Sequence, residues 1–168
     1  MIPGTMTKTP SNMKKQQLPS ENEDQVVAEL LSKEGFTTHI KAGNHYLVAD
    51  EPTEVGGKDM GPSPYEYLSA GLAACTAMTL QLYAKRKGWP LETVRVHTRY
   101  GKKHAEDCGR CEEEDARIDT FERVLELLGP LSNAQRERLL DIAGKCPVHR
   151  TFDSRIQILT RLTEPDRE

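Results

Sequence analysis

Four cysteines are the residues of this 168-residue sequence with the most distinctive chemistry: Cys75, Cys108, Cys111 and Cys146. They are too few to hold a small secreted fold together by disulfides, and residues 1–17 contain no apolar core of an export signal. We therefore expect a cytoplasmic protein. In that reducing compartment, cysteines are typical of catalysis or metal binding.

Cys75 and Cys146 have different surroundings in the sequence. Cys75 lies within an apolar helical stretch, where the simplest interpretation is a small buried thiol with a raised pKa. Cys146 precedes Pro147 at the expected start of a new helical turn, with His149 and Arg150 within that turn. Unpaired backbone N–H groups and the positive end of a helix dipole favour a thiolate there. The alternative is a helix-terminal cysteine that only packs.

The other two cysteines belong to a candidate metal site. His104, Cys108 and Cys111 have the spacing H-x3-C-x2-C, which is compatible with part of a zinc site. The fourth ligand of a closed site could come from His97 or from a second subunit. The acidic run at 112–115 disfavours thiolates, so we expect no nucleophile in this loop. A structural zinc, a disulfide and two uninvolved cysteines all remain open.

The strongest predicted element is a helix over Pro64–Lys87, which carries Cys75. Ser63 and Glu66 form an S-x-x-E capping box at its start, and Gly88 supplies the stop. Its interior is rich in small residues, which let another backbone approach closely. The residues are Ala70, Gly71, Ala73, Ala74 and Ala77. We expect a central, tightly packed helix and a homodimer in which two such helices meet.

The remaining elements indicate an α+β fold. We expect a helix or strand over 25–31, a hairpin over 36–50 that turns at Gly43-Asn44, and a strand over 91–100. Residues 116–128 are typical of a strand at first and then ambiguous. A second capping box starts a helix at Ser132 that ends at Gly144, and 155–162 alternates as a last strand. The polar residues 1–24 are expected to be a disordered tail before a single domain, 25–168.

Composition excludes two classes of protein. With 23 basic and 26 acidic residues, the formal net charge is −3, so we expect no nucleic-acid partner. The longest apolar stretch, 68–83, has 16 residues and is interrupted by polar side chains. It is shorter than the roughly 20 residues that a membrane span needs, so we expect no membrane partner.

Two segments resemble the OsmC/Ohr family, and in particular its OsmC-like redox protein branch: GPSPYEYLSAGLAACTAMTLQLYAKRKGWPLE and DIAGKCPVHRTF. The resemblance covers about residues 36–162. It implies an OsmC-like α+β fold in which two subunits intertwine, with two central helices packed against β-sheets and active sites at the dimer interface. It also implies thiol-dependent reduction of organic hydroperoxides in oxidative-stress defence, with no required cofactor and a thiol or dithiol as reductant. Cys75 matches the peroxidatic cysteine and Cys146 the resolving one.

The sequence departs from the family pattern beside the first cysteine. The family's hydroperoxide reductases activate that cysteine with an arginine from an upstream strand, held by a glutamate ten residues before it. Here the first arginine of the chain is Arg86, and Tyr65 stands at the glutamate's position. Glu66, one residue closer, is the candidate catalytic carboxylate, although the capping box already explains it.

The positive charge for Cys75 could instead come from Lys41, His45 or Lys58. Without such a charge, Cys75 should titrate high and react slowly. The alternative function is then a non-catalytic redox-sensing or small-molecule-binding protein of the same fold.

Overall fold

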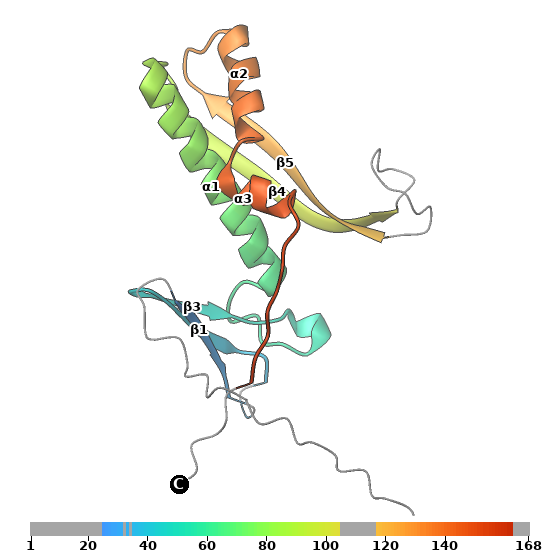
Figure 1. Cartoon of the computed structure of the whole chain (residues 1–168). Coiled ribbons are helices and arrows are strands. Elements are labelled where there is room, and N and C mark those ends of the chain that lie inside the picture. Colours follow the sequence, from blue (N-terminus) through green and yellow to red (C-terminus); the bar gives the residue numbers. More distant parts are fainter. Residues whose placement is uncertain (1–24, 32, 34, 105–116, 163–168) are drawn as a thin grey trace, which may run out of the picture.

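The long helix α1 (Pro64–Lys87) joins two β-sheets in the computed structural model, which describes residues 25–31, 33, 35–104 and 117–162 (Figure 1). Strands β1 (Val26–Leu30), β2 (Thr38–Ala42) and β3 (His45–Ala49) lie at its N-terminal end, followed by the 3-10 turn η2 (Thr53–Val55). Strands β4 (Thr93–His104) and β5 (Arg117–Leu128) and helices α2 (Asn133–Ala143) and α3 (Pro147–Phe152) lie along its length.

The first sheet is antiparallel in the order β1-β2-β3. The predicted hairpin is confirmed, because Ala42 pairs with His45 across the two-residue turn and Gly43 has a φ of 57°. The segment whose type the sequence left open, 25–31, forms β1. Its side chains are exposed along the whole strand, so the described part of the chain covers neither face of β1.

A buried carboxylate organises the loop that leads from this sheet into α1. Asp50 is 2% exposed and accepts hydrogen bonds from the Thr37 hydroxyl and from three backbone N–H groups, those of Glu51, Lys58 and Met60. The loop folds back closely on β3: a Cβ on Gly61 would lie 2.2 Å from the carbonyl oxygen of Val48. Asp50 therefore fixes the point at which α1 begins.

Helix α1 has the predicted bounds. The Ser63 side chain accepts from the Glu66 N–H, the Glu66 carboxylate accepts from the Ser63 N–H, and Gly88 ends the helix in the left-handed conformation with a φ of 64°. One face is buried through Leu72, Thr76, Leu80 and Ala84. The opposite face exposes apolar side chains, among them Met78 and Leu82 at 71% and 57%. This helix is therefore apolar on both faces, with one of them uncovered.

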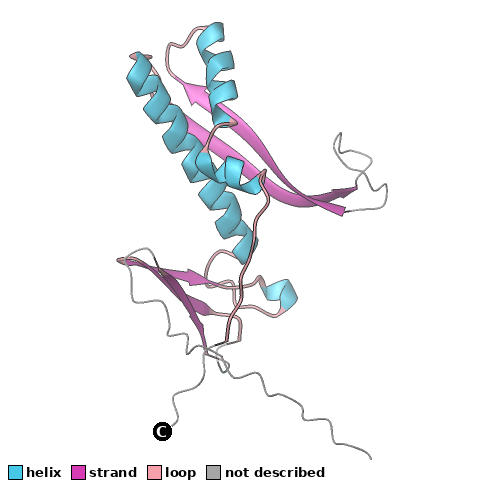
Figure 2. Ribbon diagram, in the orientation of Figure 1, coloured by secondary structure: helices cyan, strands magenta, loops and turns pink. Residues whose placement is uncertain are grey.

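The second sheet is the antiparallel pair β4–β5, in register from Thr93↔Leu128 to His104↔Arg117. All three main helices pack on one side of this pair (Figure 2). The predicted α2 is confirmed, with a capping box of Ser132 and Gln135. The core joins α1, α2 and the inner face of the sheet through buried residues: Leu80, Ala84, Leu91, Leu127, Leu131, Leu139, Ile142 and Ala143.

One predicted element is wrong. Residues 155–162 form no strand; after α3 they run as an extended segment toward the three-stranded sheet (Figure 1). Alternation alone does not make a strand, because the backbone needs a neighbouring edge with which to pair. The apolar side chains of this segment are uncovered, with Ile158 84% and Leu162 98% exposed. Strand β4 also extends beyond the predicted 91–100, to His104.

Candidate functional site

Cys75 and Cys146 lie together where the middle of α1 meets the start of α3 (Figure 1). Cys146 is the N-cap residue of α3, as predicted, and is 0% exposed, whereas Cys75 is partly exposed. Both are free thiols, and each shifts the pKa of the other, so their side chains interact. Elements more than sixty residues apart in sequence thus bring the two thiols into contact.

The surroundings of Cys146 favour its thiolate. Burial by itself raises the pKa of this group, but the nearby Cys75 thiol, the His149 and Val148 N–H groups and the Thr76 hydroxyl stabilise its negative charge and outweigh burial, so that the pKa lies below its ordinary value. The two N–H groups belong to the first turn of α3, where helical backbone donors have no partner within the helix. This is the effect expected from the sequence at a helix N-terminus.

The surroundings of Cys75 favour its thiol. Burial raises the pKa of Cys75, and the hydrogen bond and negative charge of Cys146 raise it further. The Val148 N–H and the Thr79 hydroxyl lower it by less. The cations considered from the sequence, Lys41, His45 and Lys58, are not among the groups with the largest effect on this pKa. Cys146 is therefore the more acidic thiol of the pair.

An arginine that the sequence analysis missed lies behind this pair. Arg123, on β5, donates from Nη1 to the Thr76 hydroxyl at 2.7 Å and to the Ala143 carbonyl at 3.3 Å, and its Nη2 lies 2.7 Å from Nδ1 of His149. The available signal was its place in the strand. Phe121, Arg123, Leu125 and Leu127 alternate on the inward face, and a charged residue among apolar ones there indicates a specific partner.

A small cavity of about 190 Å³ adjoins the arginine. Apolar walls from three elements and the polar groups of α3 and β5 surround it: Leu72, Phe121, Arg123, His149, Phe152 and Asp153. Phe121 and Phe152 end a row of four aromatic rings with centroid separations of 4.2, 5.1 and 5.2 Å, which starts with Tyr65 and Tyr100. A larger hollow of about 710 Å³ lies on the three-stranded sheet and contains neither thiol.

Glu66 is placed at the first turn of α1, in the capping box. Hydrogen bonds from the Ser63 N–H and hydroxyl lower the pKa of its carboxylate, so Glu66 is held ionised by the cap. The side chains of His104, Cys108 and Cys111 lie outside the described residues. Within the residues that are described, no group of three or more His, Cys, Asp or Glu side chains is arranged to hold a metal ion.

Over the ranges that the structure describes, no helix combines the length and the hydrophobicity needed to cross a bilayer.

Comparisons with known proteins agree with this architecture. The family model described as OsmC-like protein matches residues 56–161. The OsmC-like protein of Mycoplasma pneumoniae superposes with a TM-score of 0.61 at 18% identity, covering 79% of this chain and 89% of that one. An organic hydroperoxide resistance protein from Legionella pneumophila gives 0.55 at 19% identity over 76% and 88%. OhrB of Bacillus subtilis gives 0.52 at 19% identity over 76% and 87%.

A search of curated proteins gave no match. The chain belongs to the OsmC-like protein family, because the family model covers more than half of its length, including both Cys75 and Cys146. The expected α+β fold is confirmed by the antiparallel sheets and the helices that pack on them.

Proposed function

We propose that this protein reduces organic hydroperoxides with its thiol pair and a thiol or dithiol reductant, as part of oxidative-stress defence. The observation that carries the proposal is the interaction of a partly exposed thiol, Cys75, with a buried one, Cys146, whose pKa is lowered. Membership of the family and the described roles of the Legionella and Bacillus structures support it.

Cys75 is the attacking residue in this proposal, because Cys146 is fully buried and Cys75 is the thiol that a substrate can reach. The raised pKa of Cys75 does not prevent this, because the Cys146 thiolate can accept its proton. Cys146 thereby acts as the base that generates the nucleophile. A catalytic role for Glu66 remains part of the proposal.

The Cys75 thiolate attacks the distal peroxide oxygen, and the O–O bond breaks, so that Cys75 becomes a sulfenic acid. The alkoxide takes from Cys146 the proton that Cys75 had given up, and it leaves as alcohol. Cys146, again a thiolate, attacks the Cys75 sulfur and displaces hydroxide, which forms the disulfide. An external dithiol then reduces the disulfide by exchange, and the two cysteines return to the starting state.

Turnover of tert-butyl hydroperoxide with dithiothreitol tests this function. We expect Cys75→Ser to abolish turnover, whereas Cys146→Ser should form a sulfenic acid that further peroxide oxidises to sulfinic acid. Cys108→Ser/Cys111→Ser is the matched control, since these two thiols have no role in the proposed cycle. Full activity in Cys75→Ser would contradict the proposal.

A specific observation also favours the second candidate, a redox-sensing protein of the same fold. The raised pKa of Cys75 reduces the fraction of reactive thiolate and so predicts slow oxidation. A sensor would form the same disulfide in response to peroxide but would not turn over. Steady turnover at about 1 per second or faster would exclude this alternative.

We propose that the functional form is an intertwined homodimer with active sites at its interface. The support is the uncovered apolar face of α1, together with the exposed apolar side chains of residues 155–162. The proposed cytoplasmic location fits a cycle that needs reduced thiols.

A structural zinc held by His104, Cys108 and Cys111 also stays a proposal. Metal analysis of protein purified without chelators tests it. A zinc content below about 0.3 per chain would exclude even a site shared between two subunits.

A further inference from the structure

The side chain of Arg123 connects every helix that meets at the thiol pair. It bonds to Thr76 on α1, to the last residue of α2, Ala143, and to His149 on α3. The Ala143 carbonyl that accepts from Arg123 also accepts from the Cys146 N–H at 3.4 Å. The Ala143 carbonyl oxygen therefore links the guanidinium of Arg123 to the backbone of Cys146.

The hydrogen bond to His149 defines the form of the imidazole. A guanidinium has donors only and no acceptor, so Nδ1 of His149 must offer a lone pair at 2.7 Å. The imidazole is then neutral and carries its proton on Nε2. His149 and Arg123 both line the 190 Å³ cavity, so this tautomer offers the cavity a neutral N–H donor. The backbone N–H of the same histidine lowers the pKa of Cys146.

The hydrogen bond to Thr76 defines what that hydroxyl can donate. Its oxygen accepts from Arg123, and its single proton is donated to the Leu72 carbonyl at 2.7 Å. The hydroxyl also lies close enough to Cys146 to lower the pKa of that thiol, so it can turn toward the sulfur when Cys146 ionises. Thr76 is 0% exposed, so water does not compete for this proton. A negative sulfur attracts the proton, and the charge of Arg123 strengthens the donor.

We propose that Arg123 is the positioning residue of the thiol site, which fixes the tautomer of His149 and aims the Thr76 hydroxyl at Cys146. The inference rests on the proposed function and deepens it. No arginine precedes Cys75 in the sequence, and Arg123 on β5 is the cation that we assign to the thiol site. The charged and titratable groups around Cys146 are then Cys75 on α1, Arg123 on β5 and His149 on α3, with Asp153 at the cavity wall.

The test measures the ionisation of each thiol and does not depend on turnover. In a Cys108→Ser/Cys111→Ser background, ¹³C-labelled cysteines report the titration of Cys75 and Cys146 separately by NMR. We expect Arg123→Met to raise the ionisation midpoint of Cys146 by about one pH unit, a tenfold smaller thiolate fraction. We also expect the ¹⁵N signals of the His149 ring to show the single Nε2–H tautomer in the wild type and to lose it in Arg123→Met.

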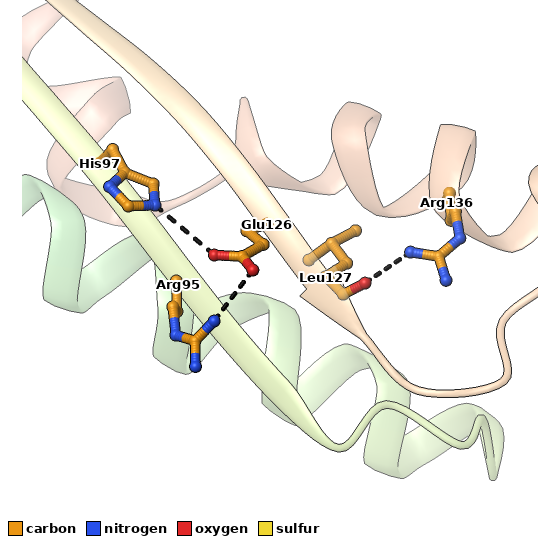
Figure 3. Close-up of polar contacts among 5 residues, drawn as sticks. All are labelled: Arg95, His97, Glu126, Leu127 and Arg136. Atoms are coloured by element: carbon orange, nitrogen blue, oxygen red, sulfur yellow. Dashed lines mark hydrogen bonds and ion pairs between the residues drawn. The ribbon is translucent and has the colours of Figure 1, made fainter.

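A matched control is Arg136 on α2. It donates to the Leu127 carbonyl (Figure 3) and to the Gly129 carbonyl, and so connects α2 to β5. Neither of these hydrogen bonds goes to a residue of the thiol site. Arg136→Met should lower the thermal stability and leave the Cys146 midpoint unchanged. If Arg123→Met behaves in the same way, Arg123 is only a structural tie and the inference is overturned.

A second pair of variants keeps the test valid should Arg123→Met fail to fold. Thr76→Val removes the hydroxyl at equal size and should raise the Cys146 midpoint, whereas Thr76→Ser should restore it. Equal midpoints in these two variants would overturn the inference. A wild type that reduces no hydroperoxide would contradict the proposed function alone, since the midpoints are measured without substrate.

Discussion

The two thiols differ in acidity because their elements offer them different donors. The Cys146 thiol lies at the start of α3, near the unpaired N–H groups of Val148 and His149, whereas Cys75 lies within α1, whose own N–H groups are used inside the helix. In the proposed reaction this difference makes Cys146 the base and Cys75 the nucleophile. The thiol that a substrate can reach is therefore not the more acidic one, because Cys146, whose pKa is lowered, is the more deeply buried.

Single alanine variants should reveal this coupling, with opposite signs. Cys75→Ala removes a donor to Cys146 and should raise the Cys146 pKa. Cys146→Ala removes both an acceptor and a negative charge beside Cys75 and should lower the Cys75 pKa toward its ordinary value. Titration of the labelled thiol left in each variant, again without Cys108 and Cys111, measures both shifts. Shifts of the same sign would show that the thiols are not coupled.

At the scale of elements, the two capping boxes determine where the helices that frame the site begin. The Ser63 and Ser132 side chains accept from the N–H groups of Glu66 and Gln135. We expect Ser63→Ala and Ser132→Ala each to cost about 1 kcal/mol of unfolding free energy, measured by urea denaturation. A cost in Ser132→Ala alone would mean that the long packed α1 does not need its cap.

The capping box of α2 uses the amide of Gln135 at the position that Glu66 occupies in α1. We therefore expect that an amide can replace the carboxylate of Glu66. The pKa of Glu66 is lower in the folded protein because of the Ser63 bonds, so its contribution to stability is present above the unfolded pKa and is lost as the pH falls through the folded one. Glu66→Gln should match the wild type in thermal unfolding at neutral pH and lose less stability in acid. Reduced turnover at equal stability would assign the carboxylate its catalytic role.

At the scale of the whole molecule, the uncovered face of α1 is the feature that the described chain leaves unexplained. A helix that is apolar on both faces belongs in an interior, and a second copy would provide one. We expect Met78→Glu to weaken dimerisation at least tenfold, about 1.4 kcal/mol. Sedimentation equilibrium, which gives the average molecular mass at each protein concentration, measures this change. Leu140→Glu, at an equally exposed apolar position on α2, is the control that should leave the dimer intact. Identical behaviour of both variants would move the interface elsewhere.

The sequence predicted what local chemistry determines. The capping boxes, the Gly43-Asn44 turn and the N-terminal position of Cys146 are each written in a few adjacent residues, and the structure has them at those positions. Two results depend on distant partners and were not predicted correctly. The extended stretch 155–162 pairs with no strand among the described residues, and Arg123 meets its partners only when β5 packs against the helices.

The most direct test of the thiol-pair reaction is a stoichiometric one. One equivalent of tert-butyl hydroperoxide is added to the reduced Cys108→Ser/Cys111→Ser protein, and the products are identified by peptide mass mapping and by assay of the alcohol. The account predicts one Cys75–Cys146 disulfide and one tert-butanol per chain. Cys75 and Cys146 that both remain free while the peroxide persists, or peroxide consumption that continues unchanged in Cys75→Ser, would contradict it.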